Sequence, residues 1–190
     1  MEPYFPAVQP DWKLKADVGI WYNIDNQTDP GQLELAYQVS RALIQANISF
    51  DAVTARQLDR LSDYKVIILS DVEMLDDMEV AALRQYVADG GKLYVSGRTG
   101  TLDAFGAKRS GDAFEDLLGI CRTGESAWPL SYMAPTAAGQ PLFDYYRADY
   151  PLCIPTKQFT LTAGENVTVL ATLAETVRDP KDNCYFSSAI

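Results

Sequence analysis

The chain has 190 residues and a mass of 21.0 kDa, with 47% apolar and 22% charged residues, the proportions of one soluble globular domain. Sixteen Lys and Arg against 26 Asp and Glu give a net charge of −10, which argues against nucleic acid or an anionic membrane as a partner. There is no histidine, and the three cysteines (Cys121, Cys153 and Cys184) have no C-x-x-C spacing, so we expect free buried thiols, no metal site and no cofactor.

Both ends of the chain look like cuts from a longer protein. Residues 1–16 hold three prolines without periodicity, which predicts an extended arm or linker before a single domain over residues 17–190. The last residues, from Cys184 to Ile190, read as a strand that stops abruptly. No signal peptide and no membrane-spanning run is present, so we expect a cytoplasmic piece, with secretion of the full-length protein left open.

The first half of the chain alternates strands with helices. Val18–Tyr22 is an apolar run that predicts a buried strand. Asp29 and Pro30 mark the start of a helix that continues to Ala46. The residues that recur at helical spacing along it are Leu33, Ala36, Tyr37, Ser40, Leu43 and Ile44.

The alternation continues to Gly100. Residues 48–53 predict a strand and 55–61 a short helix, and Val66–Leu69 is uniformly apolar, which is typical of a strand buried on both faces of a parallel sheet. Asp76 or Asp77 caps a helix that ends at Gly90-Gly91, and residues 92–96 predict a fourth strand.

Beyond Gly100 the pattern is looser. Residues 112–118 predict a short helix and 128–155 irregular structure, while 159–162 and 167–172 predict an antiparallel hairpin. The aromatic residues of this half either fill a core or stack on sugars or another subunit. They are Trp128, Tyr132, Phe143, Tyr145, Tyr146 and Tyr150.

Short links between alternating strands and helices predict right-handed crossovers. The expected fold class is therefore α/β: a flavodoxin-like, three-layer sandwich with a mostly parallel sheet and a C-terminal antiparallel β-hairpin. Ligands of such folds bind at the carboxyl ends of the strands. The candidate ligand or interface residues at these ends are Asn23, Asp25, Ser70, Asp71, Glu73, Ser96, Arg98 and Thr99.

The strand-to-helix turn at Ser96-Gly97-Arg98-Thr99-Gly100 resembles the nucleophile turn of the class I glutamine amidotransferase-like fold. Arg98 stands where that fold carries its cysteine, and a guanidinium cannot attack a carbonyl. Ser96 or Thr99 would need a base other than histidine. We therefore assign no catalytic residue to this chain.

Two further interpretations of the strand ends remain open. Asp25 with Asp71, or Asp71 with Glu73, has the composition of a glycosidase carboxylate pair, but such acids more often cap the following helix. Arg98 either pairs with Asp71 or Asp103 or binds an anion or a sugar hydroxyl.

The whole run from Asp17 to Gly100 resembles the β-galactosidase trimerisation domain, the amidotransferase-like middle domain of glycoside hydrolase family 42. The similarity rests on Val18–Trp21, the helix from Leu33 to Ala46, Asp63–Leu69 and Tyr86–Leu93, and continues in Phe114–Ile120. The resemblance implies a neighbouring catalytic barrel that holds the catalytic carboxylates. It also implies a role for this domain in subunit contact and in closing part of the neighbouring site.

Three hypotheses follow. The leading one is a noncatalytic assembly domain of a β-galactosidase-like glycoside hydrolase, a homo-oligomer as a trimer or dimer, with an exposed apolar patch. The alternative is a module that binds carbohydrate or another small ligand at the strand ends. The third is a divergent hydrolase, which requires Ser96 or Thr99 within reach of a lysine or carboxylate.

Overall fold

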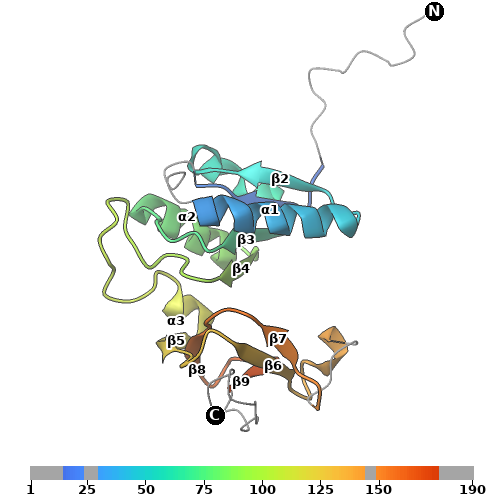
Figure 1. Cartoon of the computed structure of the whole chain (residues 1–190). Helices are drawn as coiled ribbons and strands as arrows, with labels where there is room; N and C mark the ends of the chain where they lie inside the picture. Colours follow the sequence, from blue (N-terminus) through green and yellow to red (C-terminus); the bar gives the residue numbers. More distant parts are fainter. Residues whose placement is uncertain (1–14, 24–29, 144–148, 176–190) are drawn as a thin grey trace, which may run out of the picture. The chain divides into compact units, whose positions relative to one another are not determined.

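The computed structural model describes residues 15–23, 30–143 and 149–175 (Figure 1). The chain groups into two compact units, Met1–Ala113 and Phe114–Ile190. That residues 17–190 form one domain stays a prediction.

Unit 1 is built on a parallel sheet of four strands in the order β2-β1-β3-β4. Residues Val18, Gly19 and Ile20 of β1 pair in parallel with both neighbouring strands, so β1 and β3 are the inner strands. The strands are β1 (Val18–Trp21), β2 (Phe50–Val53), β3 (Val66–Ser70) and β4 (Lys92–Ser96). The predicted α/β fold class with a parallel sheet is confirmed.

Helical segments connect these strands. They are α1 (Pro30–Gln45), η1 (Ala55–Asp63) and α2 (Asp77–Ala88). The strand order reverses direction at β1, and right-handed crossovers then place α1 on one face of the sheet and η1 with α2 on the other. In agreement, α2 contacts η1, and in Figure 1 α1 lies in front of the strands of unit 1.

Local capping explains where two of these segments begin. The Thr54 side chain accepts a hydrogen bond from the Arg56 amide, and the Gln57 side chain bonds back to Thr54. At α2, Asp76 Oδ1 accepts from the Glu79 amide (2.6 Å) while Glu79 Oε2 accepts from the Asp76 amide (2.7 Å). Both are capping boxes. Of the two caps predicted for α2, Asp76 is the one used.

The core of unit 1 lies on both faces of the inner strands. Ile20, Ile67, Leu69 and Leu83 are fully buried. In β3, Ile67 and Leu69 are fully buried on one face. Val66 and Ile68, on the other face, are only half-buried, so the apolar run predicts more burial on that face than the structure has. Full burial of one such side chain contributes about 1.5–3 kcal/mol.

The helix α1 buries only some of the residues that recur at helical spacing along it. Ala36 is buried, whereas Tyr37 is 58% exposed and Ile44 65% exposed. Tyr37 and Ile44 are seven residues apart, two helical turns, so they form one outward stripe. The residues that recur at helical spacing thus include exposed as well as buried positions.

The described residues of unit 2 form one short α-helix, one short 3-10 helix and two antiparallel sheets. The helix α3 (Glu115–Leu118) ends at Gly119, as predicted, with Gly119 in the left-handed conformation (φ 66°). One sheet pairs β5 (Ile120–Glu125) with β8 (Phe159–Ala163). The other has the order β7-β6-β9, from β7 (Leu152–Ile154), β6 (Ser131–Pro135) and β9 (Ala171–Glu175).

The predicted C-terminal hairpin is wrong, because its two strands belong to different sheets. β8 pairs with β5, and β9 pairs with β6. The reason lies at Thr136: its amide donates to Leu170 O (2.9 Å) and its hydroxyl to Val169 O (2.7 Å). These bonds hold the segment before β9 at the end of β6.

The segment 128–155 is more regular than predicted, since it contains β6, the short helix η2 (Gln140–Leu142) and β7. Of its aromatic residues, Tyr150 is 75% exposed and Tyr132 is half-buried, while Tyr145 and Tyr146 lie outside the described residues.

Cys121 and Cys153 are free but exposed, so the prediction of buried thiols is wrong for both; Cys184 lies outside the described residues. No helix in the described part of the chain is long and apolar enough to span a membrane.

Candidate functional site

The carboxyl ends of β1, β3 and β4 meet at one edge of the sheet, and most of the predicted site residues lie there. Asn23, just after β1, donates from Nδ2 to Met74 O (2.6 Å) in the loop after β3. Met74 in turn forms a bridge with Leu102 in the segment after β4. Asp25 lies outside the described residues.

Arg98 joins the two loops that follow β3 and β4. Its backbone amide donates to Asp71 Oδ1 (2.5 Å), and its Nη2 donates to Asp71 Oδ2 (3.2 Å). Its Nη1 lies 3.5 Å from Glu73 Oε2. Of the two partners that the sequence suggested, Asp71 is therefore the one that Arg98 uses, and the carboxylates of Asp71 and Glu73 share one guanidinium.

The turn requires unusual backbone conformations. Gly97 has φ 62° and Asp71 φ 53°, both in the left-handed region. A Cβ on Gly97 would lie 2.2 Å from Asp71 Oδ1, a distance no side chain tolerates. Glycine at position 97 adopts this φ without steric cost and leaves room for the close approach of the Asp71 side chain.

Thr99 is a structural residue of this turn. It is 3% exposed, and its hydroxyl donates to Ser96 O (2.7 Å) and accepts from the Val72 amide (3.0 Å). The hydroxyl therefore ties the end of β4 to the loop after β3. A side chain held in this way is not poised to attack a substrate.

One candidate residue has a buried polar atom without a partner. Ser70 is 7% exposed, and its Oγ makes no hydrogen bond to the described residues. Trp21 Nε1, at the end of β1, is in the same state. Unsatisfied buried polar atoms are uncommon and often mark a site for water or a ligand. Within the described residues no group of three or more His, Cys, Asp or Glu side chains is arranged to hold a metal ion.

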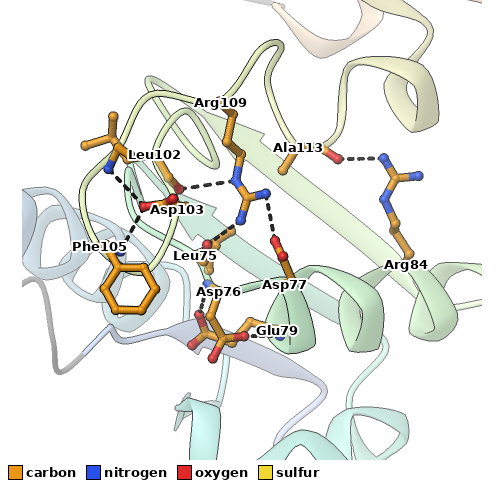
Figure 2. A network of polar contacts seen from close by, with 11 residues as sticks. Leu75, Asp76, Asp77, Glu79, Arg84, Leu102, Asp103, Phe105, Arg109 and Ala113 are labelled. Atoms are coloured by element: carbon orange, nitrogen blue, oxygen red, sulfur yellow. Dashed lines mark hydrogen bonds and ion pairs between the residues drawn. The ribbon is translucent and has the colours of Figure 1, made fainter.

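A network centred on Arg109, which no sequence pattern predicted, lies beside these strand ends (Figure 2). The guanidinium of Arg109 donates to Leu75 O (2.7 Å) and Leu102 O (3.3 Å) and forms an ion pair with Asp77 (2.8 Å). Two of its three partners are backbone carbonyls, which no sequence pattern identifies. The sequence Asp103-Ala104-Phe105-Gly106 is typical of a turn, and this was the signal that could have indicated an ordered loop before Arg109.

A pocket of about 220 Å³ lies away from these strand ends, beside the residues that precede β1 and β3. It is lined by polar residues that include Asp17, Asp51, Arg60 and Tyr64. Here Tyr64 Oη donates to Asp51 Oδ2 (2.9 Å). None of the predicted site residues lines this pocket.

The raised pKa of Tyr64 makes the chain less stable at alkaline pH. Burial, and next the hydrogen bond to Asp51, raise the pKa of Tyr64 to about 12, from 10.0 for a free phenol. The unfolded chain therefore loses this proton first, and stability is lost as pH rises from about 10 towards 12. We expect urea titrations between about pH 9 and about pH 12 to show this decline, and Tyr64→Phe to reduce it. Tyr94→Phe, which removes an exposed phenol, is the control and should keep the full loss of stability at alkaline pH. If Tyr64→Phe lost as much stability over this pH range as the unsubstituted chain, the assignment of the decline to Tyr64 would be contradicted.

The strand order and the edge formed by Asn23, Asp71 and Arg98 all lie in unit 1. Residues 17–126 match the family model described as the β-galactosidase trimerisation domain. The chain belongs to this family. Two curated relatives, β-galactosidases BgaB from Geobacillus sp. (strain Y412MC61) and Geobacillus kaustophilus, are each 31% identical over 121 residues, 57% of this chain. The match covers only 18% of each relative.

Solved structures share the fold of this trimerisation domain at low sequence identity. The cold-adapted β-galactosidase from Rahnella sp. R3 has a TM-score of 0.69 at 16% identity, over 85% of this chain and 25% of that one. The GH42 β-galactosidase Gan42B from G. stearothermophilus has a TM-score of 0.67 at 17% identity, over 83% of this chain and 23% of that one. α-L-Fucosidase isoenzyme 2 from Paenibacillus thiaminolyticus has a TM-score of 0.68 at 21% identity, over 86% of this chain and 24% of that one. In each case the likeness covers about a quarter of a longer chain.

Proposed function

We propose that the chain is a noncatalytic assembly domain of a larger, β-galactosidase-like glycoside hydrolase. The match to the trimerisation domain family over residues 17–126 carries this proposal. The curated relatives that support it are β-galactosidases of which the chain covers 18%. In this proposal the catalytic carboxylates belong to another part of the parent enzyme, and this domain holds copies of the enzyme together.

The turn after β4 supports a noncatalytic role. Arg98 occupies the position of the amidotransferase nucleophile, and its guanidinium pairs with the carboxylates of Asp71 and Glu73. Thr99 is committed to backbone partners. A divergent hydrolase would need an activated hydroxyl at this turn, and these contacts favour a rigid scaffold instead.

Light scattering coupled to size-exclusion chromatography tests assembly on the chain as it stands. We expect a molar mass that is a multiple of 21.0 kDa, decreasing on dilution if association is weak. A single species at 21.0 kDa at every concentration would contradict the proposal.

A second candidate function is the binding of a carbohydrate at the strand ends, favoured by the unpartnered Ser70 hydroxyl. Sugar hydroxyls both donate and accept hydrogen bonds, which suits a buried serine beside the Asp71–Arg98 pair. Titration with galactose, followed through the backbone amide signals of Ser70, Asp71 and Arg98, tests it. Saturable shifts at these amides would support binding, and unchanged spectra at high galactose concentration would contradict it.

A further inference from the structure

Phe105 is the most exposed large apolar residue in the described part of the chain. Its side chain is 95% exposed and lies at the tip of the loop that follows the β4 turn. Figure 2 shows its ring extending away from the residues around it. Burying a phenylalanine against a partner recovers a large hydrophobic free energy that full exposure forgoes.

The loop that carries Phe105 is braced internally. Asp103 Oδ1 accepts from the amides of Phe105 (2.8 Å) and Ala107 (2.9 Å), and the Asp103 amide donates to Ala107 O (2.9 Å). Gly106, with φ 77°, completes the turn. Phe105 is thus presented on a preformed turn and not on a loose chain.

The base of the same loop is fixed to the sheet. The Arg109 amide donates to Thr101 O (2.9 Å), and the Leu102 amide donates to Glu73 O (3.0 Å). The Arg109 guanidinium then ties the loop to Leu75 and to Asp77 at the start of α2. A residue held in its binding geometry loses little conformational entropy on association, which raises affinity.

A closed ring of three copies needs two different surface patches on each copy, since each copy contacts its two neighbours through opposite sides of one heterologous interface. Unit 1 offers a second patch in the outward stripe of α1. Tyr37 and Ile44 are exposed there and share one side of the helix. An aromatic tip and an apolar helix face have the complementary chemistry of a projecting residue and its acceptor.

We propose that Phe105 docks on the Tyr37–Ile44 stripe of a second copy of this chain and is a main contact of its assembly. This inference rests on the proposed function, because it names the surface through which that assembly forms. Central aromatic residues of this kind commonly dominate interface energetics.

Sedimentation velocity over a range of concentrations tests the proposal. We expect Phe105→Ala to raise the dissociation constant at least about tenfold while circular dichroism and thermal unfolding stay unchanged, because the ring contributes little to the fold. Leu142→Ala, which truncates another exposed apolar side chain (68% exposed), is the matched control and should associate normally. Asp103→Ala keeps Phe105 but loosens its turn, so it should weaken association less than Phe105→Ala.

Mixing two variants tests the pairing itself. Ile44→Ser removes the acceptor but keeps Phe105, whereas Phe105→Ala keeps the acceptor. Each variant alone should be impaired, and the mixture should regain an interface in which Phe105 of one variant meets the intact stripe of the other. Failure of the mixture to associate better than either variant would overturn the pairing.

The outcomes separate this inference from the function on which it rests. A monomeric unsubstituted chain would overturn both. An oligomer unaffected by Phe105→Ala would overturn the inference and leave the assembly function standing. Unchanged association of Phe105→Ala, together with a saturable galactose-induced shift at the Phe105 amide of the unsubstituted chain, would also overturn it, by assigning the ring to sugar stacking.

Discussion

Replacement of Gly97 by alanine is expected to destabilise the chain by about 2–4 kcal/mol. The left-handed φ of 62° costs a residue with a side chain about 1–2 kcal/mol. The new Cβ would also lie 2.2 Å from Asp71 Oδ1, so the carboxylate must move and give up its bonds to Arg98. Urea denaturation followed by circular dichroism measures the loss.

Two comparisons isolate the clash from the backbone strain. Gly106 also has a positive φ (77°), but nothing lies within 4 Å of its added Cβ, so Gly106→Ala should show the strain alone. In the double variant with Asp71→Ala, the Gly97→Ala substitution should cost less than it does alone, because the obstructing carboxylate is gone. Equal costs at Gly97 and Gly106 would refute the close-packed turn.

Replacement of Thr99 by valine is expected to cost about 1–3 kcal/mol of stability. Valine has nearly the shape of threonine, so packing is kept while the acceptor for the buried Val72 amide is lost. The donor to Ser96 O disappears with it. The free energy of unfolding from urea titration measures this loss.

Thr101→Val is the matched control for Thr99→Val. The Thr101 hydroxyl donates to Arg98 O (2.9 Å) at a more exposed position, where water can replace it. This control should therefore change stability by less than about 0.5 kcal/mol. A Thr99→Val variant as stable as the control would contradict the structural role of the Thr99 hydroxyl.

The fold of unit 1 was predictable because its signals are local. The apolar run of β3 identifies a strand of the core, and Asp76 with Glu79 forms a cap that can be recognised from four consecutive residues. Short links between strands and helices then favour right-handed crossovers and a parallel sheet. The helix α1 shows the limit, because periodicity alone did not separate buried Ala36 from exposed Tyr37.

The sheets of unit 2 were not predictable in the same way. A strand pattern identifies a strand but not its partner, and β8 pairs with β5 about 40 residues earlier in the chain. The side chain of Thr136, which fixes the segment before β9, acts across more than 30 residues. Such long-range bonds leave no periodic trace in the sequence.

Some residues of the candidate site could likewise be predicted from the sequence, and others could not. The ion pair between Arg98 and Asp71 was among the expected alternatives, because both residues follow adjacent strands. Arg109 and Phe105 were missed, since Arg109 binds carbonyls and Phe105 is notable only for its exposure. Whether the strand-end residues contact a ligand stays a prediction.

Native mass spectrometry of the unsubstituted chain is the most direct measurement of the central claim, because it counts the copies in each complex. The assembly proposal predicts a species of three copies of the 21.0 kDa chain that persists at micromolar concentration. A spectrum that holds monomer alone, under conditions that preserve other weak complexes, would contradict it.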